Sequence, residues 1–265
     1  MSDHGLVGTL ARAVERLGSA EMGVRLDGID ALMRLADDSP SPLEGPARAL
    51  EAFVRRRAPA SRLDDRLMLP TVPRPRQTAG PEADVQAALT ALGRVPRQHH
   101  WLDLSGLDLS RARLGGLNLS YAHLYAAELC EADLRHTNLR NAHLAYADLS
   151  GARLEGAILS RTVLIGANLS GADLREADLH GLYLCDVTLH EVDLSGADLV
   201  DADLRGVRLD GVDLLDADLS GANLRGTVMT GVRGMTLDDL QPVAWTDERT
   251  WVEERPAEPG LGAGN

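Results

Sequence analysis

Leucine recurs at every fifth position through the middle of this chain. The series runs without a break from Leu104 to Leu224, which is 25 leucines, and Met229 holds the next position. The residue two before each leucine is usually small, and the residue directly before it is often Asp or Asn. A fixed short period sustained over such a stretch indicates a repeat architecture.

A period of five fits neither an amphipathic helix nor a plain strand. The two apolar positions of each unit are two residues apart, so the backbone between them is extended and both side chains share one face. The three residues that follow are rich in Ser, Gly, Asp and Asn, which favour turns. Each unit is therefore an extended side plus a corner, and sides that bury one face must coil around an axis and stack.

The valines in the small position indicate how many sides a coil has. Val192, Val212 and Val232 are twenty residues apart, and so are Val187 and Val207. Twenty residues are four units, which predicts a square coil. At this count, residues 101–231 would form about 6.5 coils, and a stacking distance of about 4.8 Å would make the rod about 31 Å long.

The repeated pattern of a small residue, Asp or Asn, Leu, Ser or Arg, and Gly resembles that of the pentapeptide-repeat proteins. Gly196-Ala197-Asp198-Leu199 is one instance and Leu219-Ser220-Gly221 is another. The resemblance covers about half of the chain and implies a right-handed quadrilateral β-helix with the leucine and the small residue inside. The run from Glu15 to Ala36 also resembles a helical region that precedes the repeats in some bacterial members. Some of those members carry membrane helices in front, which this chain lacks.

The sequence outside the repeats predicts helices at both ends. We expect an α-helical module over 1–57, a Pro-rich linker over 58–81, a helix over 82–100 that caps the first coil, the β-helix over 101–231, and a C-terminal capping helix with a disordered tail over 232–265. The C-terminal helix is expected to start at Thr236, in a capping-box-like segment, and to continue through Leu240 to about Trp245.

The sequence offers no constellation typical of catalysis or metal binding. His123 and His143 are twenty apart and are expected to stack on one outer face, but without a carboxylate or thiol partner there they make a poor metal site. Cys130 and Cys185 are interpreted as reduced thiols on different faces. We therefore expect no enzyme activity, metal or cofactor. No run of 18 or more apolar residues and no secretion signal is present, so a cytoplasmic location is expected.

Acidic residues concentrate in the second half of the repeats. The chain has 27 basic and 40 acidic residues, a net charge of −13. Residues 166–231 hold 13 acidic and 4 basic residues, whereas 101–165 hold 7 and 6. With twenty-residue coils, two columns of aspartates form a candidate partner-binding face: Asp173, Asp193 and Asp213, and beside them Asp178, Asp198 and Asp218. The alternative is that these aspartates only serve their own corners by local hydrogen bonds and are otherwise solvated.

Two functions follow from these observations. The first is a non-enzymatic protein-interaction scaffold built on an acidic rod. The second comes from the resemblance, because some pentapeptide-repeat proteins are DNA mimics that bind DNA gyrase or topoisomerase IV and protect it from fluoroquinolones or other topoisomerase poisons. The resemblance also implies a possible homodimer through the C-terminal end, with Trp245, Trp251 and Leu240 as cap or dimer contacts. The negative charge disfavours direct binding to nucleic acid or to an anionic membrane.

Overall fold

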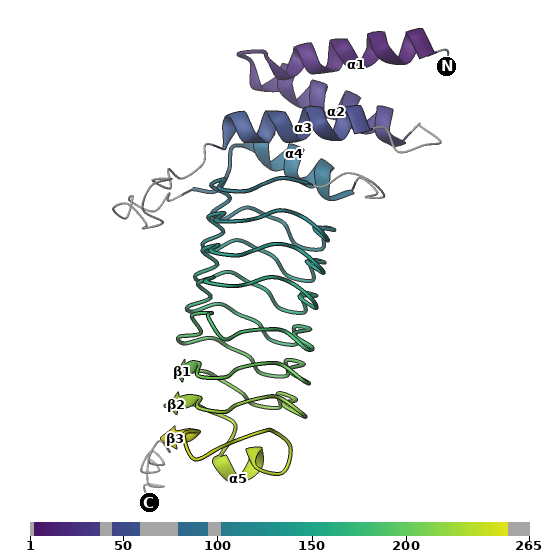
Figure 1. Cartoon of the computed structure of the whole chain (residues 1–265). Helices are drawn as coiled ribbons and strands as arrows, with labels where there is room; N and C mark the ends of the chain where they lie inside the picture. Colours follow the sequence, from purple (N-terminus) through teal and green to yellow (C-terminus); the bar gives the residue numbers. More distant parts are fainter. Residues whose placement is uncertain (1–2, 38–43, 59–78, 95–101, 254–265) are drawn as a thin grey trace, which may run out of the picture.

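The protein is a β-solenoid with a group of helices stacked on its N-terminal end (Figure 1). The computed structural model describes residues 3–37, 44–58, 79–94 and 102–253. Most of the expected Pro-rich linker and the tail expected to be disordered from Glu258 onward lie outside these residues. The elements in chain order are α1 (Asp3–Leu17), α2 (Met22–Asp37), α3 (Glu44–Arg57), α4 (Ala83–Arg94), β1 (Arg208–Asp210), β2 (Val228–Thr230), α5 (Leu237–Leu240) and β3 (Trp251–Glu253).

Parallel pairing between residues twenty apart builds the solenoid. The first bridge joins Asp103 to His123, and the spacing is kept as far as Asp213 with Arg233. Twenty residues correspond to four units a coil, which is the spacing that the valines predict. The leucines from Leu104 to Leu224 fill the axis, and none is more than 2% exposed. Each buried leucine contributes about 1.5–3 kcal/mol against the entropy lost on ordering the coil.

The corners need a left-handed backbone at every fifth residue. The residue two after each leucine of the series, except Leu184, has a positive φ, for example 67° at Gly106 and 59° at Arg111, and twelve such residues are not glycine. The Asp or Asn that precedes the leucine stabilises this turn. The Asp193 Oδ1, for example, accepts a hydrogen bond of 3.0 Å from the Ser195 amide. The local hydrogen-bonding role expected for Asp and Asn is therefore present, and it closes a corner that a side chain otherwise disfavours.

A buried arginine joins the N-terminal helices to one another. The Arg25 side chain on α2 is 7% exposed, and its Nε lies 2.5 Å from Oδ2 of the fully buried Asp84 on α4. Its second nitrogen donates to the carbonyls of Ser19 and Ala20, in the turn after α1, at 3.0 and 2.7 Å. One guanidinium thus connects the α1–α2 turn to the start of α4. No helix in the described part of the chain is both long and apolar enough to cross a membrane.

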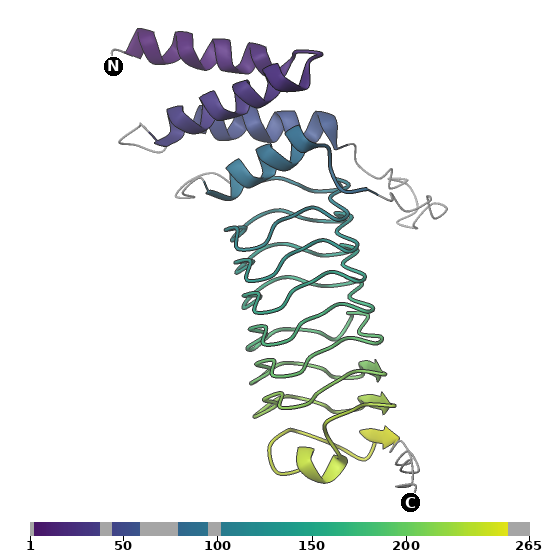
Figure 2. The ribbon, with the colours of Figure 1, turned by 180° about the vertical axis from the view of Figure 1, so that it is seen from behind.

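Helix α4 lies on the open edge of the first coil, as both views show (Figures 1 and 2). The Gln86 side-chain amide donates to the Arg113 carbonyl at 2.7 Å and accepts from the Arg113 amide at 2.8 Å. The Asn118 amide donates to the carbonyl of Gly93 at 3.2 Å. These bonds satisfy backbone groups that the next coil would otherwise pair, so less of the β edge is left open to association with another chain.

The contact between α4 and the first coil requires a glycine at position 93. A Cβ on Gly93 would lie 2.7 Å from the Cβ of Leu117. We therefore expect Gly93→Ala to push α4 from the coil and to speed amide hydrogen exchange at Asn118. Gly8→Ala on α1 is the control, since nothing lies within 4 Å of its added Cβ. Both changes improve helix propensity, so faster exchange in both variants would contradict the steric explanation.

The C-terminal part differs from its prediction. Helix α5 ends at Leu240 instead of continuing to about Trp245. Trp245 then bridges Asn223, and β3 pairs with β2 so that Trp251 lies beside Val228. These spacings are 22 and 23 residues instead of twenty, because the segment containing α5 adds residues while the ladder continues. The repeat pattern is lost in the sequence although the solenoid goes on.

The three residues predicted as cap or dimer contacts have different environments. Leu240 on α5 is 1% exposed and packs into the core. Trp245 and Trp251 are 57% and 52% exposed, so most of each indole is left uncovered. The Arg225 guanidinium lies 5.3 Å from the centre of the Trp245 ring, a cation–π distance. Leu240 therefore contributes to the packing at this end, while the two tryptophans remain available to a partner.

Candidate protein-interaction faces

The residues directly before the leucines form a column on each side of the solenoid. We call one side the mixed-charge face, and its column is Arg113, Asp133, Arg153, Asp173, Asp193, Asp213 and Arg233. The predicted aspartates of the first set thus do stack, because each bridges the next coil. However, arginines lie at both ends of the column and beside it, so the column is not uniformly negative.

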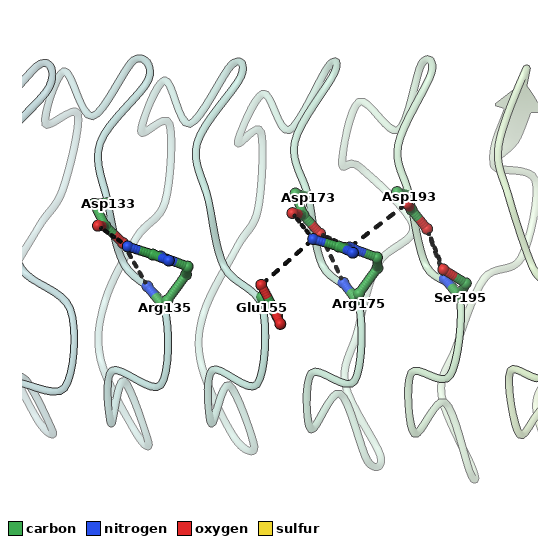
Figure 3. A network of polar contacts seen from close by, with 7 residues as sticks. All are labelled: Asp133, Arg135, Glu155, Asp173, Arg175, Asp193 and Ser195. Carbon is green, nitrogen blue, oxygen red and sulfur yellow. Dashed lines mark hydrogen bonds and ion pairs between the residues drawn. The ribbon is translucent and has the colours of Figure 1, made fainter.

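Arg175 compensates the charge in the middle of the mixed-charge face (Figure 3). It binds Asp173 through two nitrogens, each at 2.8 Å, and lies 3.8 Å from Asp193 and 3.4 Å from Glu155. Arg233 lies 3.2 Å from Asp213. Every aspartate of the first predicted set therefore has an arginine partner, so this column is not a stripe of free negative charge.

The same arginine sets the titration of Asp173. Its hydrogen bond to the carboxylate holds the pKa of Asp173 below the usual value. A lowered pKa means that this pair stabilises the fold above the usual pKa of about 4 and that the contribution is lost as the pH falls through the folded-state pKa. We expect Arg175→Gln to raise the pKa of Asp173 toward its usual value, measured by carboxyl NMR titration. Asp203, whose pKa is lowered by Arg205, is the internal reference and should not move.

The adjacent side of the solenoid, which we call the split face, carries the second predicted set. Its column is Asn118, Asn138, Ile158, Asp178, Asp198 and Asp218. Oδ1 of each of the three aspartates accepts a hydrogen bond of 3.0–3.1 Å from the amide of the second residue after it. Within the described ranges none of the three aspartates has an ion pair. The negative charge of this column is therefore not compensated by a neighbouring arginine.

The other half of the split face is basic. Arg140 and Arg161 are exposed and form no ion pair with any residue that the structure describes. The sides 117–121, 137–141 and 157–161 contain no Asp or Glu. A depression of about 450 Å³ lies where the two halves meet, lined by Arg140, Ser160, Arg161, Asp178, His180, Gly181 and Asp198. Charge counts along the chain do not show this division, because the two halves of the face are interrupted by residues of the other three sides.

The next side, which we call the aromatic face, gathers aromatic and large aliphatic side chains, most of them exposed. Its members are His123, Tyr125, His143, Tyr146, Val163, Ile165 and Tyr183. The expected stacking of His123 with His143 is present, with ring centres 6.4 Å apart. Tyr125 packs on His143 at 6.2 Å and on the edge of Tyr146 at 5.6 Å. The sequence signal that was missed is the absence of Asp and Glu from 117–127, 137–147 and 157–167, three segments twenty residues apart.

The described residues do not assemble a metal-binding cluster. No three His, Cys, Asp or Glu side chains among them are placed to hold a metal ion. Cys130 and Cys185 are both in the reduced, thiol form. Burial raises the pKa of the Cys185 thiol, which disfavours the reactive thiolate form. The surfaces of this solenoid are therefore best described by what they could bind.

Comparison with known proteins identifies the repeats. The family model for pentapeptide repeats matches in eight copies, over 108–144, 122–161, 142–181, 159–190 and 189–226. The chain belongs to the pentapeptide-repeat family, and its solenoid is the right-handed β-helix of that family. No curated protein sequence matches the chain significantly.

Solved structures of other pentapeptide-repeat proteins are similar over about half of the chain. HetL, which is involved in heterocyst differentiation regulation in the cyanobacterium Nostoc sp. strain PCC 7120, is 33% identical over 49% of this chain and 75% of its own, with a TM-score of 0.20. Rfr23 from the cyanobacterium Cyanothece 51142 is 33% identical over 46% and 64%, with a TM-score of 0.20. A trypsin-treated form of QnrB1, a plasmid-mediated fluoroquinolone resistance protein, is 18% identical over 52% and 79%, with a TM-score of 0.40.

Proposed function

We propose that the protein is a non-enzymatic scaffold that binds a protein partner through its aromatic face. The observation that carries the proposal is the exposure of large apolar side chains on a regular β ladder. Tyr146 is 52% exposed, Ile165 42%, Val163 36% and Tyr183 46%. These residues lie on consecutive coils, so they form one patch and are not scattered singly. Contiguous exposed apolar patches mark interaction sites.

The chemistry of the patch suits a protein surface. Aromatic residues are enriched and charged residues depleted at the centre of protein interfaces. The coils of His123, His143 and Val163 carry no carboxylate on this side, although the chain as a whole has 40 acidic residues. The backbone behind the patch is held by hydrogen bonds to the coils above and below, for example from the Leu144 amide to the Val163 carbonyl at 2.8 Å. A rigid surface loses little conformational entropy on binding.

Site-specific photo-crosslinking in the source cells tests this proposal. A photoreactive amino acid at position 165 should trap one partner of defined mass, and Tyr146→Ser should abolish the trapping. The matched control is the same amino acid at position 153, where Arg153 is exposed on the mixed-charge face, the opposite side of the rod. The proposal is wrong if positions 165 and 153 trap the same products, or if position 165 traps none.

The second candidate function is DNA mimicry toward a type II topoisomerase. It is supported by the unpaired column of Asp178, Asp198 and Asp218, and by Asp201 at a corner of the same face. Successive coils stack about 4.8 Å apart, so the column presents regularly spaced negative charge, as a DNA backbone does. Of the two columns predicted from the sequence, this one has no arginine partner in the part of the chain that the structure describes.

Gyrase supercoiling assays separate the two columns. The protein should inhibit supercoiling, or protect gyrase from a poison, and Asp178→Arg with Asp198→Arg and Asp218→Arg should remove the effect. The same three changes at Asp173, Asp193 and Asp213 are the matched control, because they remove equivalent corner hydrogen bonds from the compensated face. No effect of the unmodified protein at micromolar concentration would eliminate this function.

A further inference from the structure

We propose that two copies of this chain associate side by side, with antiparallel rods, through the split face. The face is divided by charge along its length. Its first three coils expose Arg140 and Arg161 and no carboxylate, and its next three coils expose Asp178, Asp198, Asp201 and Asp218 and no arginine or lysine. A surface divided in this way is complementary to a second copy of itself turned end for end.

The symmetry of the pairing follows from the register of the coils. A twofold axis lying in the interface, across the rod, would pass between the coil of Ile158 and the coil of Asp178. The coil of Ile158 then faces the partner's coil of Asp178, and the coil of Asn138 faces that of Asp198. Arg161 lies on the coil of Ile158 and Arg140 on the coil of Asn138. Each arginine therefore faces a coil of the partner that carries an aspartate. Parallel rods would instead place like charges opposite each other, which disfavours that arrangement.

The centre of the face has room and apolar surface for such a contact. Ile158 lies at the boundary between the basic and acidic halves, next to the proposed twofold axis, and is 39% exposed. Gly181 has no side chain, and the depression of about 450 Å³ opens between it and Arg161. An arginine of the second copy can enter this depression and reach the Asp178 or Asp198 carboxylate. Each of these carboxylates uses Oδ1 for its own corner, and no protein donor to Oδ2 is found among the described residues.

The interface is small, so the dimer should be weak. Six coils at about 4.8 Å give a face about 29 Å long and only one side of a four-sided coil wide, which offers less area than the roughly 800 Å² per partner of a standard interface. Charge complementarity of this kind determines register and partner choice more than affinity. We therefore expect dissociation in the micromolar range. The mixed-charge face is less suited to such pairing, because Arg175 and Arg233 already bind carboxylates of the same chain next to its aspartate column.

Reciprocal charge reversal tests the proposal by sedimentation velocity. Arg140→Asp with Arg161→Asp makes the whole face acidic, and Asp178→Arg with Asp198→Arg makes most of it basic. Each variant alone should be monomeric at concentrations where the unmodified chain dimerises. An equimolar mixture of the two should form heterodimers, and a chain carrying all four changes should dimerise again. Circular dichroism confirms that each variant is folded.

Three results would overturn the proposal. The first is an unmodified chain that stays monomeric at several hundred micromolar. The second is a dimer that survives either charge reversal, and the third is a mixture that forms no heterodimer. The variant with Trp245→Ala and Trp251→Ala distinguishes the alternative, a dimer through the C-terminal end. The side-by-side dimer should persist in that variant, whereas loss of dimerisation there would assign the contact to the end of the rod.

Discussion

Replacing Leu164 with arginine is expected to unfold the middle of the solenoid, at a cost of about 5 kcal/mol or more. Truncating a buried leucine alone costs about 2–5 kcal/mol, and an unpaired guanidinium in the core adds a desolvation penalty. Leu164 is 1% exposed at the axis. Each coil contacts only its neighbours, so the damage should separate the two halves into independently unfolding parts. Urea unfolding followed by circular dichroism should change from one transition to two.

The neighbouring position supplies the control. Val163 belongs to the same coil but is 36% exposed on the aromatic face. Val163→Arg adds the same charge to the same coil without placing it at the axis, so it should change stability by less than about 1 kcal/mol. Equal destabilisation by the two variants would show that the cost comes from added charge and not from the burial of position 164.

Asp84→Ala is expected to release the N-terminal helices from one another, at a cost of about 3–5 kcal/mol. The change leaves the Arg25 guanidinium buried without its carboxylate partner, and breaking a buried ion pair from one side is strongly destabilising. Hydrogen exchange should rise in α2 and α4 and remain slow in the coils after Leu134, because those coils are held by their own ladder.

Two variants test the origin of that cost. Glu82→Gln removes the exposed partner of Arg57 and should cost about 1 kcal/mol or less. Replacing the buried pair together, with Arg25→Met and Asp84→Leu, should recover much of the stability, because neither position then buries a lone charge. If the double variant is no more stable than Asp84→Ala, packing and not charge explains the loss.

The fold could be predicted from the sequence because a single local rule dictates it. Each leucine, and the small residue two positions before it, can be buried only by pointing toward the inside of the coil, whatever the other residues are. The conformation of one unit therefore predicts that of the next. The alignment of Asp178 with Asp198 followed from the same rule. The end of α5 could not be predicted, since Thr236 signals a helix start and no residue signals that Trp245 rejoins the ladder.

The character of the faces was harder to predict. Arg175 neutralises its column because its side chain reaches across to neighbouring coils, which depends on the conformation of a long side chain. Tyr125 and Tyr146 occupy different positions of the five-residue unit on successive coils, and their contact depends on the orientation of the two rings. Position along the chain was therefore enough to place a residue on a side, but not to show which neighbours it contacts there.

The twenty-residue spacing of the bridges also determines how such a chain can change length. A duplication of one whole coil lengthens the rod and returns every later residue to its own side. An insertion of one five-residue unit is equally compatible with the core, yet it rotates everything that follows by a quarter turn. Asp178, Asp198 and Asp218 would then move around the corner from Ile158. The length of an insertion thus determines which side of the rod the later residues occupy, while the leucine core stays unchanged.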